Sequence, residues 1–128
     1  MRAHISRPVL EAILAHAQAT PRLEVCGLLF GEGTAILRAE PAANVHPDPA
    51  GHFEVDPGAL IAAHKAARAG GPRLIGHYHS HPSGSATASR EDAAAAEPGQ
   101  LCLIVAGGSW RLYRGVPEGL EPAGLDVA

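Results

Sequence analysis

The sequence has little positive charge, few aromatic side chains and no long apolar run. Its 10 lysine and arginine residues are scattered among 13 acidic ones, for a net charge of −3, so no basic surface is available to a nucleic-acid backbone. The N-terminal segment is interrupted by Arg7, Pro8, Glu11 and His16, and it lacks both a membrane span and the apolar stretch of a signal peptide. We therefore expect a cytoplasmic protein with no nucleic-acid partner and no membrane contact.

Cysteine is also scarce. Cys26 and Cys102 are the only two, and each lies inside an apolar run. This placement favours buried, reduced side chains over a disulfide. No Cys-x-x-Cys pair is present, and this argues against a closed structural zinc site of the cysteine-rich kind.

The length of 128 residues suits one domain with its own core, so we predict a single domain over 1–128, with 116–128 as a flexible tail. Helix signals, each an N-cap residue before a helical segment, lie at Ser6, Asp56 and Ser89. Predicted strands lie between the helices, at 24–33, 34–40, 53–56, 72–82, 100–108 and 109–115. This order predicts an α+β fold with a mixed, mainly antiparallel sheet and flanking helices.

Residues 76–82, GHYHSHP, contain three histidines at alternate positions of a predicted strand. His77, His79 and His81 would share one face, with Tyr78 and Ser80 on the other. Histidines two positions apart are separated by about 7 Å along a strand, a span that two imidazoles can close onto one ion. All three would strain the strand, so we expect a pair of histidines and a third ligand from elsewhere.

Asp92 is the nearest candidate for that ligand, because the loop over 82–88 can turn back toward the strand. Two histidines and a carboxylate leave a fourth position for water, as in catalytic zinc sites. The structural alternative is that Ser89 and Asp92 only cap a helix and that the histidines are a packed pair. The two features together favour the metal site.

The segment HSHPSGSATASRED, residues 79–92, resembles the JAMM motif of the MPN (JAB1/MPN/Mov34) metalloproteases. The shared pattern is His79-x-His81, seven residues, Ser89, two residues and Asp92.

The resemblance extends over most of the chain, from Glu24 to the last strands. EVCGLLFG, residues 24–31, is similar to the family's first strand, where an acidic residue precedes Gly-Leu-Leu. NVHPDPAGHFEVDP, residues 44–57, is similar to the loop, strand and helix start of small prokaryotic members.

The resemblance implies the cytidine-deaminase-like JAB1/MPN fold and a zinc-dependent peptidase or isopeptidase. By position, His79, His81 and Asp92 would hold Zn²⁺. Glu24 would accept a proton from the attacking water and pass it to the leaving amine, and Ser89 would hydrogen-bond the oxyanion.

Neighbouring residues receive lesser roles. We expect Ser80 and Pro82 to position the site. His77 departs from the family's pattern and is given no metal role. The remaining histidines are expected at the surface; they are His4, His16, His46, His52 and His64.

The resemblance also implies a substrate: the tail of a ubiquitin-like or sulfur-carrier β-grasp protein, cleaved after its C-terminal Gly-Gly. Such a tail could add to an exposed sheet edge of a monomer or homodimer. One alternative is a zinc amidase acting on small molecules. Another is a non-catalytic MPN scaffold, which the presence of all five motif residues disfavours. Sites with two histidines and an aspartate also accept divalent ions other than zinc.

Overall fold

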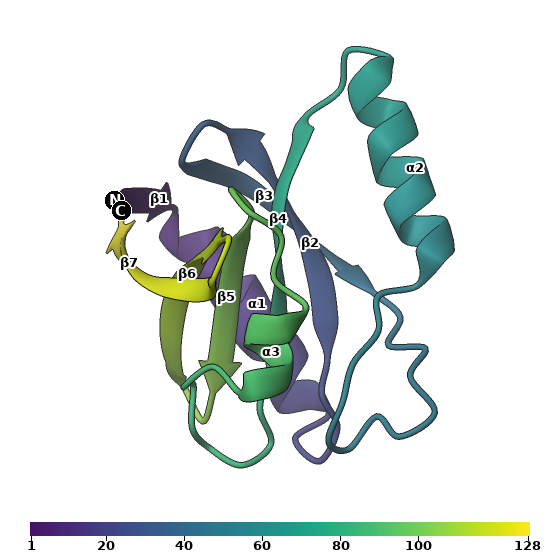
Figure 1. Ribbon diagram of the computed structural model, residues 1–128, viewed down its shortest axis with the longest axis vertical. Helices are drawn as coiled ribbons and strands as arrows, with labels where there is room; N and C mark the ends of the chain where they lie inside the picture. Colours follow the sequence, from purple (N-terminus) through teal and green to yellow (C-terminus); the bar gives the residue numbers. More distant parts are fainter.

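The chain forms seven strands and three helices, and the computed structural model describes residues 1–128 (Figure 1). In chain order the elements are β1 (Arg2–Ile5), α1 (Arg7–Ala19), β2 (Cys26–Glu32), β3 (Ala35–Ala42), α2 (Pro57–Arg68), β4 (Arg73–Ser80), α3 (Arg90–Ala94), β5 (Leu101–Ala106), β6 (Ser109–Val116) and β7 (Gly119–Val127).

The strands form one mixed sheet in the order β1-β3-β2-β4-β5-β6-β7, which closes because β1 pairs with both β3 and β7. The β1–β3, β1–β7 and β4–β5 pairs are parallel, and the other four are antiparallel. The predicted α+β class with a mixed, mainly antiparallel sheet is confirmed. Strands β2 and β3 form one antiparallel hairpin, and β5 and β6 form another.

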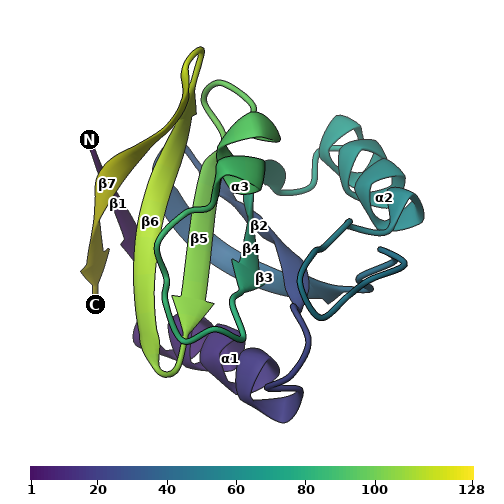
Figure 2. The ribbon, with the colours of Figure 1, turned by 60° about the horizontal axis from the view of Figure 1, so that its bottom comes forward.

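Helix α1 begins where the sequence predicts. The Ser6 hydroxyl accepts a hydrogen bond from the Val9 amide, and the helix ends at Ala19 with Thr20 as its C-cap. Its buried residues, Leu10 and Ile13, belong to the main core. Figure 2 shows α1 across one end of the sheet. At 13 residues it is the longest helix, and none of the three has the length and apolar character of a membrane span.

Helix α2 packs on the face of β2 that points away from α1. Leu29 of β2 points into the main core with α1, whereas Leu28 and Phe30 pack with Ala63 of α2 in a separate cluster. This division follows from the alternation of side chains along a strand. In both ribbon views α2 stands to the side of the sheet (Figures 1 and 2).

The predicted strand over 53–56 is wrong. Only an isolated bridge, Asn44 to Val55, forms there. Two backbone bonds make this bridge, from the Val45 amide to the Glu54 carbonyl and from the Asp56 amide to the Ala43 carbonyl. The Asn44 side chain adds to them: its Oδ1 accepts the Glu54 amide proton at 3.0 Å, and its Nδ2 donates to the His52 carbonyl at 2.9 Å. Asp56 then begins α2, so no room remains for a strand.

The predicted flexible tail over 116–128 is also wrong, because β7 closes the sheet. It pairs with β6 on one side and with β1 on the other. Pro122 and Gly124 lie inside it, and both residue types disfavour a strand interior, which explains the failure. The sequence did not predict strand β1, which is only four residues long and pairs with β7 over its whole length.

Closure of the sheet limits the edge predicted to bind a substrate tail. Strand β3 pairs with β1 only at Ala35 and Ile36, so its remaining residues are paired to β2 alone. Free edges therefore remain on one side of residues 37–42 of β3 and on one side of residues 119–123 of β7.

Candidate metal centre

Strand β4 lies between β2 and β5 and alternates its side chains as predicted. Tyr78 lies in the main core, and its hydroxyl is 2.6 Å from Nδ1 of His16 on α1. His79 faces the other way and is fully buried. His81 lies just past the end of β4, where its amide donates to the Val105 carbonyl. Its side chain is 12% exposed, so one face of the centre is open to solvent.

Three groups converge on one point. His79 Nε2 lies 3.1 Å from Asp92 Oδ1, and His81 Nε2 lies 3.1 Å from Asp92 Oδ2. The two Nε2 atoms are 3.2 Å apart. Adjacent ligand atoms of a tetrahedral zinc ion with bonds of about 2.0–2.1 Å are about 3.3 Å apart, so this donor set fits such an ion.

The tautomer of His81 strengthens this fit. Its Nδ1 donates to the Ser85 carbonyl at 2.8 Å, so in the neutral ring the Nε2 lone pair faces Asp92 and His79. In the protonated ring, Nε2–H would instead donate a hydrogen bond to Asp92. The neutral ring can therefore offer Nε2 to a cation, which makes this group a candidate metal site.

The capping box expected as the structural alternative is present, and it also orients the aspartate. The Ser89 hydroxyl accepts the Asp92 amide proton at 3.0 Å, and the Ser89 amide donates to Asp92 Oδ2 at 2.9 Å. The preceding loop is fixed by Tyr113, whose hydroxyl accepts the Ala88 amide proton. Asp92 thereby lies in the first turn of α3 with its carboxylate, 6% exposed, turned toward the histidines.

Glu24 lies beside this group, just before β2. One of its carboxylate oxygens, together with one ring nitrogen each of His79 and His81, forms a set within 4.8 Å of one another. Ser80 holds the adjoining backbone: its hydroxyl accepts the Val25 amide proton at 2.9 Å, and its amide donates to the Val25 carbonyl. These bonds are consistent with the positioning role predicted for Ser80.

The electrostatics of the group follow from burial and mutual contacts. Burial raises the pKa of Glu24 to about 6. Burial alone would also raise the pKa of Asp92, yet its hydrogen bonds to His79 and His81 outweigh this and hold it well below its usual range. The bond to Asp92 raises the pKa of His81, whereas burial lowers that of His79. At neutral pH the aspartate is ionised and available as a ligand.

Sequence reasoning missed the contacts made by the loop between β3 and α2. The ring of Phe53 stacks on His79, with centroids 4.2 Å apart and planes at 21°. His52 pairs with Glu91 at 2.8 Å, beside Asp92, so its assignment to the dispersed surface histidines is incomplete. No spacing rule signals these contacts, because they depend on how the loop folds across the sheet.

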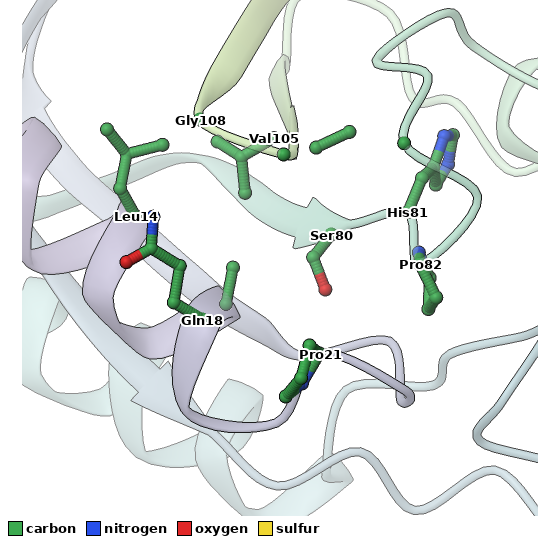
Figure 3. A pocket seen from close by; sticks show the side chains of 12 residues that line it. Leu14, Gln18, Pro21, Ser80, His81, Pro82, Val105 and Gly108 are labelled. Carbon is green, nitrogen blue, oxygen red and sulfur yellow. The ribbon is translucent and has the colours of Figure 1, made fainter.

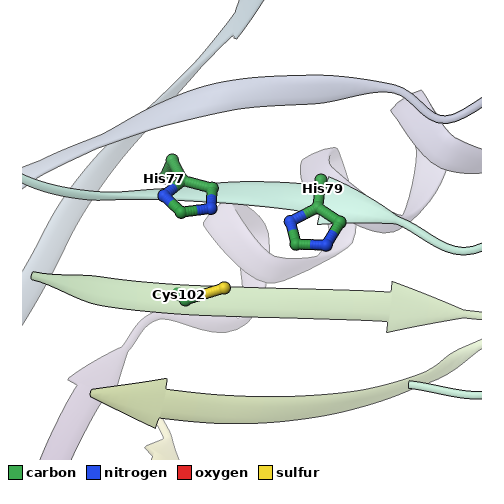
Figure 4. Close-up of side chains that lie close together, drawn as sticks. All are labelled: His77, His79 and Cys102. Atoms are coloured by element: carbon green, nitrogen blue, oxygen red, sulfur yellow. The ribbon is translucent and has the colours of Figure 1, made fainter. Parts of the chain in front are cut away.

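Both cysteines are buried and free, as predicted. Cys102 lies near His77 and His79 on one face of the sheet (Figure 4). Burial raises the pKa of its thiol to about 12, so it is a neutral thiol.

A small pocket adjoins the centre on the side of α1. It has a volume of about 170 Å³ and extends from Leu14 and Gln18 on the helix to His81 and Pro82 (Figure 3). The glycines Gly107 and Gly108 of the β5–β6 turn complete its wall.

Residues 6–115 match the family model described as prokaryotic homologues of the JAB domain. A desampylase from Haloferax volcanii is 33% identical over 110 residues, which cover 80% of this chain and 79% of that protein. A probable TtuB-protein conjugate cleaving protease from Thermus thermophilus is 38% identical over 89 residues, covering 70% of this chain but 60% of that protein.

Solved structures agree with this assignment. A Desulfitobacterium hafniense protein, solved in solution, superimposes with a TM-score of 0.82 at 30% identity over 100% of this chain and 93% of its own. A protein described as having a JAMM metalloprotease-like zinc site gives 0.64 at 23% identity over 100% and 99% of the two chains, which shows the shared fold. The chain belongs to the prokaryotic JAB/MPN family of JAMM metalloproteases, and its α+β fold is that of the family.

Proposed function

We propose that this protein is a zinc-dependent peptidase or isopeptidase that cleaves after the C-terminal Gly-Gly of a ubiquitin-like or sulfur-carrier β-grasp protein. The central observation is the convergence of His79, His81 and Asp92 at 3.1–3.2 Å beside the buried Glu24. The relatives support the substrate class, since both are named for removing or cleaving protein conjugates.

His79, His81 and Asp92 would hold the metal. The chemistry that zinc would supply there is that of a Lewis acid, which lowers the pKa of water and polarises a carbonyl. Glu24 accepts a proton at its carboxylate and returns it to the leaving amine, a task suited to a group with a pKa near neutrality.

Ser89 is proposed to hydrogen-bond the oxyanion. Its hydroxyl oxygen already accepts from the Asp92 amide, so its proton is free to be donated toward a substrate oxygen. Accepting at the helix cap and donating to the oxyanion use different parts of one hydroxyl and are therefore compatible.

The metal is tested first. Protein purified without chelator is assayed for metal content by mass spectrometry, beside His81→Ala and Asp92→Ala. We expect about one zinc per chain in the wild type and far less in both variants, because each loses one of three protein ligands. A folded wild-type protein that takes up no added zinc would contradict the proposal and favour the scaffold alternative.

The reaction is tested with a β-grasp carrier bearing a short extension after its Gly-Gly. We expect cleavage by the zinc-loaded wild type, and a rate at least 10²-fold lower for Glu24→Gln, which keeps the ligands but removes the base. A free peptide with the same tail sequence serves as the comparison. Equal cleavage of peptide and carrier would favour the small-substrate amidase instead.

A further inference from the structure

The Nδ1 atom of His79 is buried and has no hydrogen-bond partner. Its other ring nitrogen, Nε2, is occupied by the contacts to Asp92 and His81. When the Nε2 lone pair of a neutral imidazole binds a cation, the ring proton must lie on Nδ1. A buried N–H group without an acceptor is costly, so the proton at Nδ1 needs a partner.

His77 offers an acceptor of the right kind two residues earlier on β4. One ligand atom each of His77, His79 and Cys102 lies within 4.8 Å of the others. In Figure 4 a ring nitrogen of each histidine faces the space beside the sulfur. A neutral imidazole nitrogen is a strong acceptor, whereas a thiol sulfur is a weak one, so His77 is the better partner.

The positions of the two rings bring their nitrogens close together. The His77 and His79 planes differ by 15°, and their centroids are 5.6 Å apart. A ring nitrogen of His77 lies within 4.8 Å of one of His79, and Nδ1 of His79 makes no hydrogen bond at this separation. A side-chain rotation that shortens the gap to about 3 Å closes the bond.

Phe53 covers both rings from the loop side. Its ring lies 4.2 Å from that of His79 and 5.5 Å from that of His77, at 21° and 34°. This cover restricts the motion of both imidazoles and excludes water that would otherwise compete for Nδ1. A hydrogen bond in such surroundings is stronger than one exposed to solvent.

We infer that His77 is a positioning residue whose ring nitrogen accepts a hydrogen bond from Nδ1–H of His79, so that Nε2 of His79 is held ready for the metal. The inference rests on the proposed function, in that it takes His79 as a ligand. It gives His77 a role that the sequence left unassigned.

The test is the zinc affinity of the purified protein, measured by competition with a chromophoric chelator. We expect His77→Leu to bind zinc 10- to 100-fold more weakly, the usual effect of removing a hydrogen-bond partner of a metal-bound histidine. His77→Gln retains an acceptor and should recover most of the affinity. Cys102→Ala, the matched control from the same cluster, should stay within about threefold of the wild type.

A spectroscopic readout separates positioning from packing. In long-range proton–nitrogen NMR spectra of the zinc-loaded protein, we expect a slowly exchanging Nδ1–H signal from His79 that is lost in His77→Leu and returns in His77→Gln. Wild-type affinity in His77→Leu, or equal losses in the Leu and Gln variants, would overturn the inference.

Two further measurements show whether the cysteine cluster itself binds metal and whether the proposed centre does. A thiolate charge-transfer band in the cobalt-substituted wild type, absent from Cys102→Ala, would mean that the cluster of His77, His79 and Cys102 itself binds metal, and the positioning role would be wrong.

Zinc affinity is also measured for Asp92→Asn. If that variant binds zinc like the wild type, the proposed centre fails, whereas a loss confined to Asp92→Asn overturns the His77 inference alone.

Discussion

Ser89 and Asp92 hold each other through two hydrogen bonds while Asp92 faces two histidines. At the scale of single residues, the capping box and the proposed metal centre are therefore one arrangement. A change at Ser89 acts on the start of α3, on the direction of the Asp92 carboxylate and on the proposed oxyanion contact. These effects can be separated by experiment.

Ser89→Ala should lower kcat by about 10²–10³, because an oxyanion donor is lost. Ser89→Thr keeps the hydroxyl and should restore most of the rate. Zinc content is measured on the same samples. If kcat falls only as far as zinc occupancy does, Ser89 acts through the cap and not through the oxyanion.

His16 gives a pH-dependent contribution to stability. Burial against Tyr78 lowers its pKa, so the unfolded chain binds a proton at a higher pH than the folded one. Stability is therefore complete above the unfolded pKa of about 6.5 and decreases as the pH falls below it. We expect urea unfolding at pH 7.5 and 5.5 to show a smaller decrease for His16→Gln than for the wild type. Equal decreases would mean that other groups account for the acid sensitivity.

At the scale of elements, the placement of Glu24 depends on how closely β2 and β4 approach. Tyr78 of β4 lies opposite Gly27 of β2, and a Cβ atom on that glycine would overlap the tyrosine ring and the Glu40 carbonyl. Because Glu24 and Val25 lead directly into β2, any separation of these strands moves the base away from the histidines.

Gly27→Ala should destabilise the protein by about 1–3 kcal/mol, the usual cost of overpacking a core. Gly51→Ala is the matched control, since Gly51 has no neighbour within 4 Å of an added Cβ and its substitution should change stability by less than about 0.5 kcal/mol. Chemical denaturation of both variants measures the difference. A neutral Gly27→Ala would show that Tyr78 moves freely, contrary to the packing described.

At the scale of the whole molecule, closure of the sheet depends on β7. This strand joins β6 to β1, and its Ala123, Leu125 and Val127 pack against the main core. Without β7, strand β1 would keep only its two paired positions with β3. The last strand is therefore part of the folded structure that supports the site.

Deletion of residues 117–128 should abolish the cooperative unfolding transition or leave the protein insoluble, because it exposes both β6 and the core. Asp126→Asn removes only exposed contacts, with Arg2 and His4, and should melt nearly as the wild type does. Thermal melting followed by circular dichroism makes the comparison. A truncated protein that melts like the wild type would restore the idea of a dispensable tail.

Local signals predicted those parts of the fold that depend on neighbours in the chain. The caps at Ser6, Asp56 and Ser89 gave three helix starts correctly. The failures were β1, β7 and the supposed strand over 53–56. The first two are stabilised by partners at the far end of the sequence, and the third is reduced to a single bridge that the Asn44 side chain supports. Pairing with a distant strand does not require an alternating pattern of apolar residues within a short segment, so the sequence does not signal it.

The sequence by itself determined the types and spacing of the chemical groups: His79-x-His81, the Ser89 cap and Asp92, with an acidic residue before the first long strand. This was possible because strand alternation and helix capping are local properties. Only the tertiary structure decided that Glu24 meets the histidines, that Phe53 covers them and that Nδ1 of His79 faces His77. Those contacts require the β2–β4 register and the folded loop between β3 and α2, which form through packing between distant segments.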